Sequence, residues 1–216
     1  MPQLFHPSTN TLAKVSLLLL LLGGGGALLL ANAYNRAPWS SQKSIIRGQP
    51  VMFSHKHHVT DVGLDCRYCH NQVENSASAG IPPTHTCMTC HSQVWSDADM
   101  LEPVRASYRE NVPLQWTRVH DLPDFVYFNH SIHVAKGVGC STCHGPVDQM
   151  PLMWRDATLH MSWCLDCHRS PAKNLRPQEE IFNMDWQPGE NQETLGQQLM
   201  AKNNVKSKVS CSTCHH

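Results

Sequence analysis

The sequence predicts a mostly α-helical fold with much irregular loop, carried on a single N-terminal transmembrane helix. Three observations lead to this prediction. An uncharged apolar run lies near the N-terminus, and no segment alternates apolar and polar residues as a half-buried strand would. A Cys-x-x-Cys-His motif occurs five times over residues 66–215 and accounts for all ten cysteines of the 216-residue chain.

The five motifs have the spacing of covalent haem c attachment. In each, two thiols add to the vinyl groups of one porphyrin, and the histidine that follows binds the iron. Zinc sites and redox dithiols also use Cys-x-x-Cys, but here His follows every pair and no cysteine is left over. The sequence therefore predicts five covalently bound haems c. The attaching cysteines are Cys66, Cys69, Cys87, Cys90, Cys140, Cys143, Cys164, Cys167, Cys211 and Cys214, and the proximal iron ligands are His70, His91, His144, His168 and His215.

The chain is too short to build an ordinary apolar core around each haem. About 36 residues per haem remain after the N-terminal segment, and domains of so few residues bury too little surface to be stable alone. Aromatic residues make up only 7% of the chain, which fits an interior filled by porphyrin faces. We therefore expect a multihaem cytochrome c domain in which the polypeptide wraps the haems.

The charge of the chain excludes some classes of partner. The 17 basic and 17 acidic residues balance and form no basic patch, so we expect no nucleic-acid partner. The haem propionates make the holoprotein acidic, which favours a redox partner with a basic docking face. No Gly-rich phosphate loop, nucleophile elbow or paired-carboxylate arrangement is present, and we expect no independent catalysis.

Residues 15–33 form the uncharged apolar run, which as a helix of 1.5 Å per residue spans about 28 Å, close to one bilayer. We expect a retained transmembrane helix that follows a cytoplasmic tail at residues 1–14. Four glycines at residues 23–26 would let a second membrane helix approach closely. A cleaved signal peptide is the alternative, because Lys14 precedes the run and Ala31-Asn32-Ala33 ends it. Haem is attached to such motifs outside the bacterial cytoplasm, so the haem domain is expected on the periplasmic side of the cytoplasmic membrane.

An internal repeat organises the rest of the chain. Phe-x-His-x-x-His occurs at residues 53–58 and 128–133, with ten residues between His55 and Cys66 and nine between His130 and Cys140. Each copy is followed by two haem motifs, which predicts two dihaem units and a fifth haem at the C-terminal end. The expected parts are a connector (34–50) and a pentahaem domain (51–216), divided into a dihaem unit (51–94), a linker (95–119), a second dihaem unit (120–170) and a fifth-haem segment (171–216).

The repeat also supplies candidates for the second axial ligands. Residues three apart on a helical turn share a face, so each copy can present two imidazoles to two different haems. This pattern resembles the multihaem cytochromes of the c3 and c7 type, in which the first histidine binds the haem just downstream and the second binds a neighbouring one. The resemblance implies that His55 and His130 are distal ligands of the haems at Cys66 and Cys140. It implies that His58 and His133 cross to other haems, which the sequence does not identify.

The first candidate for the fifth distal ligand is His120, and the second is Met161. Thioether ligation by Met161 would raise the potential of its haem. The remaining alternatives are His160, Met150, Met153 and His85. His57 lies off the face shared by His55 and His58 and is expected in solvent.

Over nearly its whole length, the chain resembles the pentahaem cytochrome c subunit of bacterial alternative complex III, a complex that oxidises quinol. Its most specific segments are residues 5–10, 122–130 and 161–164. The resemblance implies an electron-transfer subunit on the periplasmic face of the lipid bilayer. The partners it implies are the membrane subunits of a quinol-oxidising complex, an iron–sulfur subunit, a monohaem cytochrome subunit, and a soluble carrier such as cytochrome c or a copper protein.

Two other functions remain as alternatives. One is a stand-alone membrane quinol dehydrogenase of the NapC type, and the other is a multihaem reductase with one open iron. The distal candidates are numerous enough to close all five irons, and no Cys-x-x-Cys-Lys variant of the motif is present, so a relay of electrons is favoured. In the fifth-haem segment, Leu195 and Leu199 at helical spacing predict a helix over residues 194–202.

Overall fold

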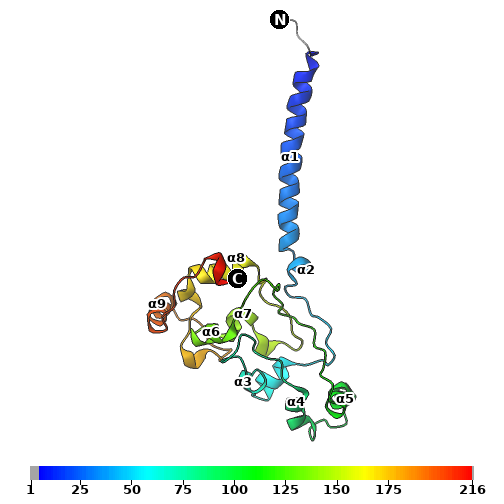
Figure 1. Ribbon diagram of the computed structural model, residues 1–216, viewed down its shortest axis with the longest axis vertical. Coiled ribbons are helices and arrows are strands. Elements are labelled where there is room, and N and C mark those ends of the chain that lie inside the picture. The colour runs from blue at the N-terminus through cyan, green and yellow to red at the C-terminus, as the bar shows by residue number, and fades with distance from the viewer. Residues whose placement is uncertain (1–4, 216) are drawn as a thin grey trace. The chain divides into compact units, whose positions relative to one another are not determined.

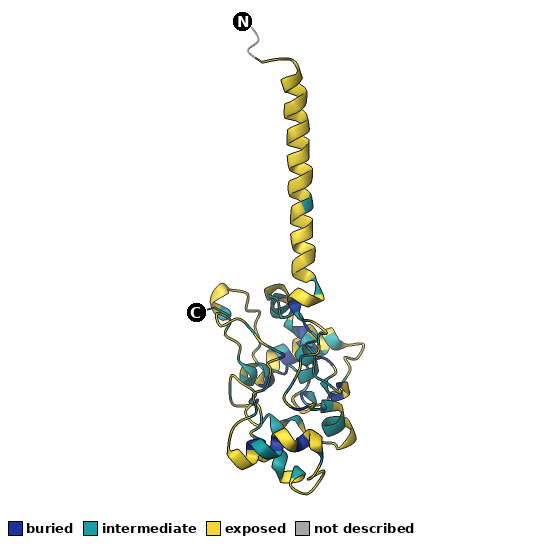
Figure 2. Ribbon diagram, turned by 90° about the vertical axis from the view of Figure 1, so that its right-hand side faces the viewer, coloured by how far each residue is buried: buried dark blue, intermediate teal, exposed yellow. Residues whose placement is uncertain are grey.

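The computed structural model describes residues 5–215, and the chain divides after Gln42 into two compact units. The first unit consists of α1 (Ser8–Arg36) and the short α2 (Pro38–Ser41). Helix α1 extends beyond the predicted residues 15–33 at both ends and buries no residue along its length (Figure 2). It is long and apolar enough to cross a membrane, and exposed leucine on all its sides suits a lipid surface better than water.

The second unit is a set of short helices joined by long loops (Figure 1). No strand occurs among residues 5–215, where only isolated β-bridges are found. The prediction of a mostly helical and irregular fold is thereby confirmed. Its elements are η1 (Lys56–Asp61), α3 (Cys66–Cys69), α4 (Thr84–His91), η2 (Asp99–Leu101), α5 (Glu102–Glu110), α6 (His130–Ala135), α7 (Cys140–His144), η3 (Val147–Gln149), α8 (Met161–Arg169), η4 (Pro171–Asn174), η5 (Gln178–Glu180), α9 (Gln192–Lys202) and η6 (Cys211–Thr213).

Every haem motif lies on a short helical turn. The turns of α3, α7 and η6 begin at the first cysteine of their motifs, whereas α4 and α8 include residues before it. Asp65 caps α3, because its carboxylate accepts a hydrogen bond from the backbone N–H of Arg67 at 2.8 Å. A single turn brings both cysteines and the histidine of a motif to one side of the backbone, as attachment to one porphyrin requires.

The protein's own side chains form little core. One cluster of buried residues is Val51, Leu101 and Val104, and a second is Val73, Val134 and Ile181. The second cluster joins the loop after the first motif to α6 and to the segment after η5. Two such small clusters are consistent with a chain that wraps prosthetic groups.

The predicted helix over residues 194–202 is confirmed as α9. It packs closely on η4, and the closest approach is at Gly196. A Cβ added there would collide with the carbonyl group of Ala172. Glycine at this position therefore lets the two elements touch, and they brace the segment that precedes the fifth motif.

Candidate functional site

Four of the five motif histidines have one ring nitrogen fixed by the backbone. Because a carbonyl oxygen only accepts hydrogen bonds, Nδ1 of each carries the proton, and the lone pair of Nε2 is left for a metal. This is the tautomer that ligation of a haem iron through Nε2 requires. The bonds run from His70 to Gly80 (2.7 Å), His91 to Val94 (3.0 Å), His168 to Lys208 (2.9 Å) and His215 to Phe125 (2.7 Å).

Three histidines of the Phe-x-His-x-x-His repeats are oriented in the same way. Nδ1 of His58 donates to the Ser54 carbonyl at 2.8 Å, and Nδ1 of His133 donates to the Asn129 carbonyl at 2.7 Å. Nδ1 of His130 donates to the Ala77 carbonyl at 2.9 Å. Nδ1 of His55 is buried and has no hydrogen-bond partner in the described part of the chain.

The repeat histidines face the motif histidines at a common separation. The ring centres of His58 and His91 are 6.2 Å apart, and those of His133 and His168 are 6.0 Å apart. The rings of His130 and His144 are 6.3 Å apart. Two imidazoles that bind one metal ion from opposite sides, each with a nitrogen at about 2 Å, have ring centres about 6 Å apart. All three pairs therefore fit a haem iron between them.

The histidines of the first and third motifs lie close together in the interior. Burial, together with the neighbouring rings of His120, His130, His70 and His55, lowers the pKa of His144 to about 3. Burial and the nearby His70 lower the pKa of His55 to about 4. Both imidazoles are therefore neutral at physiological pH, which is the form that binds iron.

The two candidates for the fifth distal ligand lie in different places. The ring of His120 is only 4.3 Å from that of His144, and its Nε2 is buried without a hydrogen-bond partner. Met161 is the first residue of α8 and is 67% exposed. The assignment of the fifth ligand stays a prediction.

Two of the remaining alternatives, and His57, have surroundings that the structure defines. Met150 is completely buried, and the ring of His85 lies 6.1 Å from that of Tyr108. His57 stacks on Trp95 at 5.6 Å and pairs with Asp61 at 3.4 Å, with its side chain 45% exposed. His57 is therefore half-exposed, and the expectation that it lies in solvent stays a prediction.

The motifs lie in a row whose order differs from their order in the sequence. The second motif adjoins the first, because Tyr68 Oη and Thr89 Oγ1 are hydrogen-bonded at 2.8 Å. The first motif adjoins the third: the Cys66 and Cys140 thiols hydrogen-bond to one another, which lowers the pKa of Cys66 to about 7 and raises the pKa of Cys140.

The third, fourth and fifth motifs are neighbours in the same order as in the sequence. Burial raises the pKa of Cys143 to about 12, and the thiols of the fourth motif add to this effect. Burial also raises the pKa of Cys164, and Cys214 of the fifth motif adds to it. The row therefore reads second, first, third, fourth, fifth. The two exposed cysteines, Cys90 and Cys211, belong to the motifs at its two ends.

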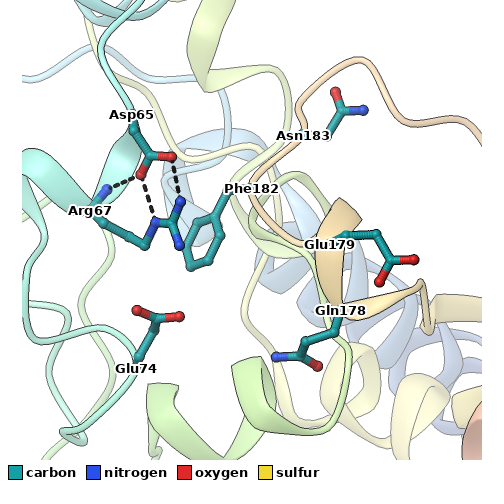
Figure 3. Close-up of a pocket in the computed structure, with 7 residues that line it drawn as sticks. All are labelled: Asp65, Arg67, Glu74, Gln178, Glu179, Phe182 and Asn183. Atoms are coloured by element: carbon teal, nitrogen blue, oxygen red, sulfur yellow. Dashed lines mark hydrogen bonds and ion pairs between the residues drawn. The ribbon is translucent and has the colours of Figure 1, made fainter.

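An open cavity of about 550 Å³ lies beside the first motif (Figure 3). Asp65 and Arg67 form an ion pair on one wall at 2.8 Å, and the Arg67 guanidinium lies 4.5 Å from the centre of the Phe182 ring. Glu74 and Glu179 also line the cavity. Its polar walls do not suit a porphyrin face, and we assign no haem to it.

Two features of the site carry no signal in the sequence. The carbonyl groups that orient the motif histidines come from any residue type, and that of Lys208 is 40 residues from His168. Arg176, which is 4% exposed, donates hydrogen bonds to the third motif. No pattern around Arg176 distinguishes it from a surface arginine.

Comparisons with known proteins agree with this geometry. Residues 126–216 match the family model of cytochrome c7 and related cytochromes c, and residues 31–115 match that of the class III cytochrome c family. The multihaem cytochrome c subunit of menaquinone reductase from Nitratidesulfovibrio vulgaris is 38% identical over 97 residues. That alignment covers 44% of this chain and 45% of the relative.

Each of the two Phe-x-His-x-x-His segments thus lies inside its own match to a cytochrome c family, and the five motifs account for every cysteine. All ten cysteines lie among the described residues, and none forms a disulfide. The chain is therefore a multihaem c-type cytochrome with five covalently bound haems c that serve electron transport, and residues 31–115 and 126–216 are similar to class III and c7 cytochromes respectively.

Proposed function

We propose that this chain is the electron-transfer subunit of a quinol-oxidising membrane complex of the alternative complex III type. It would take electrons from quinol oxidised in membrane subunits and pass them to a periplasmic cytochrome c or copper protein. The relative in Nitratidesulfovibrio vulgaris is named as a subunit of a menaquinone reductase, which supports a quinone-linked complex. The resemblance to the pentahaem subunit of alternative complex III, along nearly the whole chain, supports quinol oxidation.

The observation that carries the proposal is the pairing of imidazoles at about 6 Å. A haem enzyme needs an open position on its iron for the substrate. The pairs His58–His91, His133–His168 and His130–His144 suit closure of three irons on both faces, and His55 lies near His70. Closed irons support a relay of electrons more than a reductase.

We assign the distal ligands accordingly. His55 and His130 would bind the haems at Cys66 and Cys140. His58 would bind the haem at Cys87, and His133 would bind the haem at Cys164. These crossings extend the sequence prediction, which left the partner haems unidentified.

For the fifth iron we favour Met161 over His120. Helix α8 carries Met161, and its Cys164 approaches Cys214 of the fifth motif. The His120 ring instead packs on His144. Thioether ligation at this end of the row would give its haem the highest potential of the set.

The row of motifs supports a path with two ends. Each bound haem supplies one iron that changes between the ferric and ferrous states and so takes up or gives up one electron. The second and fifth motifs, with their exposed Cys90 and Cys211, are the ends at which partners can approach. The chain's role is to hold the ligands in fixed orientation, through backbone carbonyl groups that need not move during transfer.

We propose that α1 is a retained single-pass anchor and that the haem unit lies on the periplasmic side. The uncharged, mostly apolar run of residues 15–33 within this helix supports this. Mass spectrometry of the purified protein tests it. A mass that includes residues 1–33 supports the anchor, and a mass that begins after Ala33 would assign the segment as a signal peptide.

The first experiment is electron paramagnetic resonance of the fully oxidised holoprotein, with a redox titration on the same sample. Five low-spin signals would support the relay. A high-spin signal of about one haem would instead favour a reductase with an open iron.

A second experiment separates the quinone-linked alternatives. Reduced quinol is added to the oxidised complex and to the isolated subunit, and haem reduction is followed optically. Reduction in the complex alone supports the proposal. Reduction in the isolated subunit favours a NapC-type quinol dehydrogenase, and no reduction in either preparation would contradict quinol oxidation.

A further inference from the structure

Arg176 is a buried cation held against the third haem motif. Its side chain is only 4% exposed. Its Nη2 donates to the hydroxyl groups of Ser141 and Thr142, the two residues between Cys140 and Cys143, at 2.9 and 3.3 Å. Its Nη1 donates to the backbone carbonyls of Glu180 and Asn183 at 3.4 and 3.1 Å.

Further contacts fix the position of the Arg176 guanidinium. The guanidinium lies 4.5 Å from the centre of the Trp186 ring, a cation–π contact. It also packs against Gly139, where an added Cβ would collide with the guanidinium. The cation therefore contacts both an aromatic ring and the backbone that leads into Cys140.

Arg176 forms no ion pair with a carboxylate in the described part of the chain. Burial lowers the pKa of Arg176, and the charge of the nearby Glu180 only opposes this shift, because the Glu180 carboxylate accepts a hydrogen bond from Asn183 at 2.6 Å instead. Nε of Arg176 is buried without a hydrogen-bond partner. An arginine stays charged at all accessible pH values, and a buried charge is costly unless a counter-charge lies near it.

We propose that Arg176 is the counter-charge of the haem attached at Cys140 and Cys143 and that it raises the reduction potential of that haem. A haem gains one negative charge on reduction, and a cation fixed nearby in a medium of low dielectric constant stabilises the reduced form. The third motif is the middle of the row, so Arg176 sets the potential of the central position. This role depends on the haem at that motif and not on the identity of the partner complex.

The test is a spectroelectrochemical titration of the full-length holoprotein carrying Arg176→Gln, after its five haems have been counted. We expect one of the five potentials to fall by at least 59 mV, which is a tenfold change in a one-electron equilibrium. Arg176→Lys keeps the charge and should retain most of the wild-type potential. Five unchanged potentials in Arg176→Gln, or an equal fall in both variants, would overturn the proposal.

A second pair of variants leaves Arg176 in place. Thr142→Asp puts a carboxylate beside the guanidinium, and Thr142→Asn is its neutral match. Aspartate is compatible with haem attachment at this position, because Asp166 occupies it in the fourth motif. We expect Thr142→Asp to lower the same single potential and Thr142→Asn to leave it in place; no difference between the two variants would refute the charge effect.

The control for the loss of an exposed positive charge is Arg169→Gln. Arg169 follows His168 directly but is 60% exposed and pairs with Asp166 at 3.7 Å. Solvent screens such a charge, so its loss should shift every potential by much less than Arg176→Gln does. An equal shift would attribute the effect to net charge and would count against the buried position of Arg176.

Discussion

In the first dihaem unit, the ring of Phe53 stands edge-on to His55 at 4.9 Å and lies flat on His58 at 4.4 Å. In the second unit, Phe128 repeats both contacts, at 4.8 Å to His130 and 4.5 Å to His133. The matching interplanar angles differ by only a few degrees, 86° against 89° and 23° against 27°. The phenyl ring and two imidazoles therefore form one packed group that occurs twice in the chain.

The backbones beneath these two groups differ. Residues 56–61 form a π-helical turn, in which the N–H of Val62 bonds to the His57 carbonyl five residues back at 3.0 Å. Residues 130–135 form an α-helix. The first unit has one more residue between its repeat and its motif, ten against nine. A π turn holds one more residue than an α turn, so it absorbs the extra residue without disturbing the rings.

The two units also differ in how their first histidine is supported. His130 Nδ1 and its backbone N–H both bond to the carbonyl of Ala77, which belongs to the first unit. The second dihaem unit therefore depends on a loop of the first dihaem unit to orient the candidate ligand His130. Within the described residues, the first dihaem unit has no corresponding hydrogen bond to Nδ1 of His55.

The largest expected effect comes from removing the crossing histidines. His58→Ala and His133→Ala should each leave one iron five-coordinate and high-spin, at the haems of Cys87 and Cys164 respectively, while the other four keep their low-spin signals. Electron paramagnetic resonance of the oxidised protein measures this. If either variant retains five low-spin signals, its histidine is no ligand and the two units are not equivalent.

The fifth haem motif lies outside both repeats, so its distal ligand has to be tested separately. Met161→Leu should remove one axial ligand and lose the highest potential of the set, because leucine matches methionine in size but cannot bind iron. His120→Phe keeps a ring against His144 and should leave that potential in place. A redox titration decides between them, and the opposite pattern would assign His120 as the ligand.

A smaller effect is expected when the two spacings are made equal. Deletion of Val62, which is 55% exposed, shortens the first spacing to that of the second, and the π turn should become an α turn. We expect five low-spin haems and a loss of stability of about 1 kcal/mol or less, as for other exposed changes.

Deletion of the exposed Ala135 is the matched control in the second unit. An α turn contains no extra residue, so this deletion should displace His133 or Cys140 and reduce the number of low-spin haems. Haem counting and electron paramagnetic resonance on both variants decide the point. Equal tolerance of the two deletions would show that the π turn has no such role.

The smallest expected effect concerns the bond between the first two motifs. Tyr68→Phe removes the hydrogen bond from Tyr68 to Thr89, which should cost about 0.5–1 kcal/mol because the pair is exposed. The equivalent position in the second unit is Thr142, which Arg176 binds instead. Thermal unfolding followed by haem absorbance measures the cost. A double-mutant cycle with Thr89→Val isolates the bond, and a coupling energy of zero would exclude it.

The sequence predicts the parts of this site that depend on local spacing. The motifs give the attachment points, and the two repeats give the candidate distal histidines, because both depend on residues within one turn of each other. The repeat does not predict which motif histidine faces His58 or His133, since that depends on how segments far apart in the chain pack. The Phe125 carbonyl that orients His215 is 90 residues away, and any residue could supply it.

The sequence also does not decide between His120 and Met161, because that choice too depends on how distant segments of the chain pack. Both residue types can bind iron, and their proximity to the fifth motif depends on how the segments on either side of α8 fold back. The π turn was also not predicted, although the unequal spacing of ten and nine residues was its signal.

The order of the motifs in space bears on how the protein matures. Synthesis presents the motifs from first to fifth, yet the first becomes an interior position with the second on one side and the third on the other. The row cannot lengthen from one end as the chain emerges. Its first pair must stay partly uncovered until Cys140 arrives beside Cys66, so the assembly of the cytochrome is complete only when the second half of the chain closes over the first.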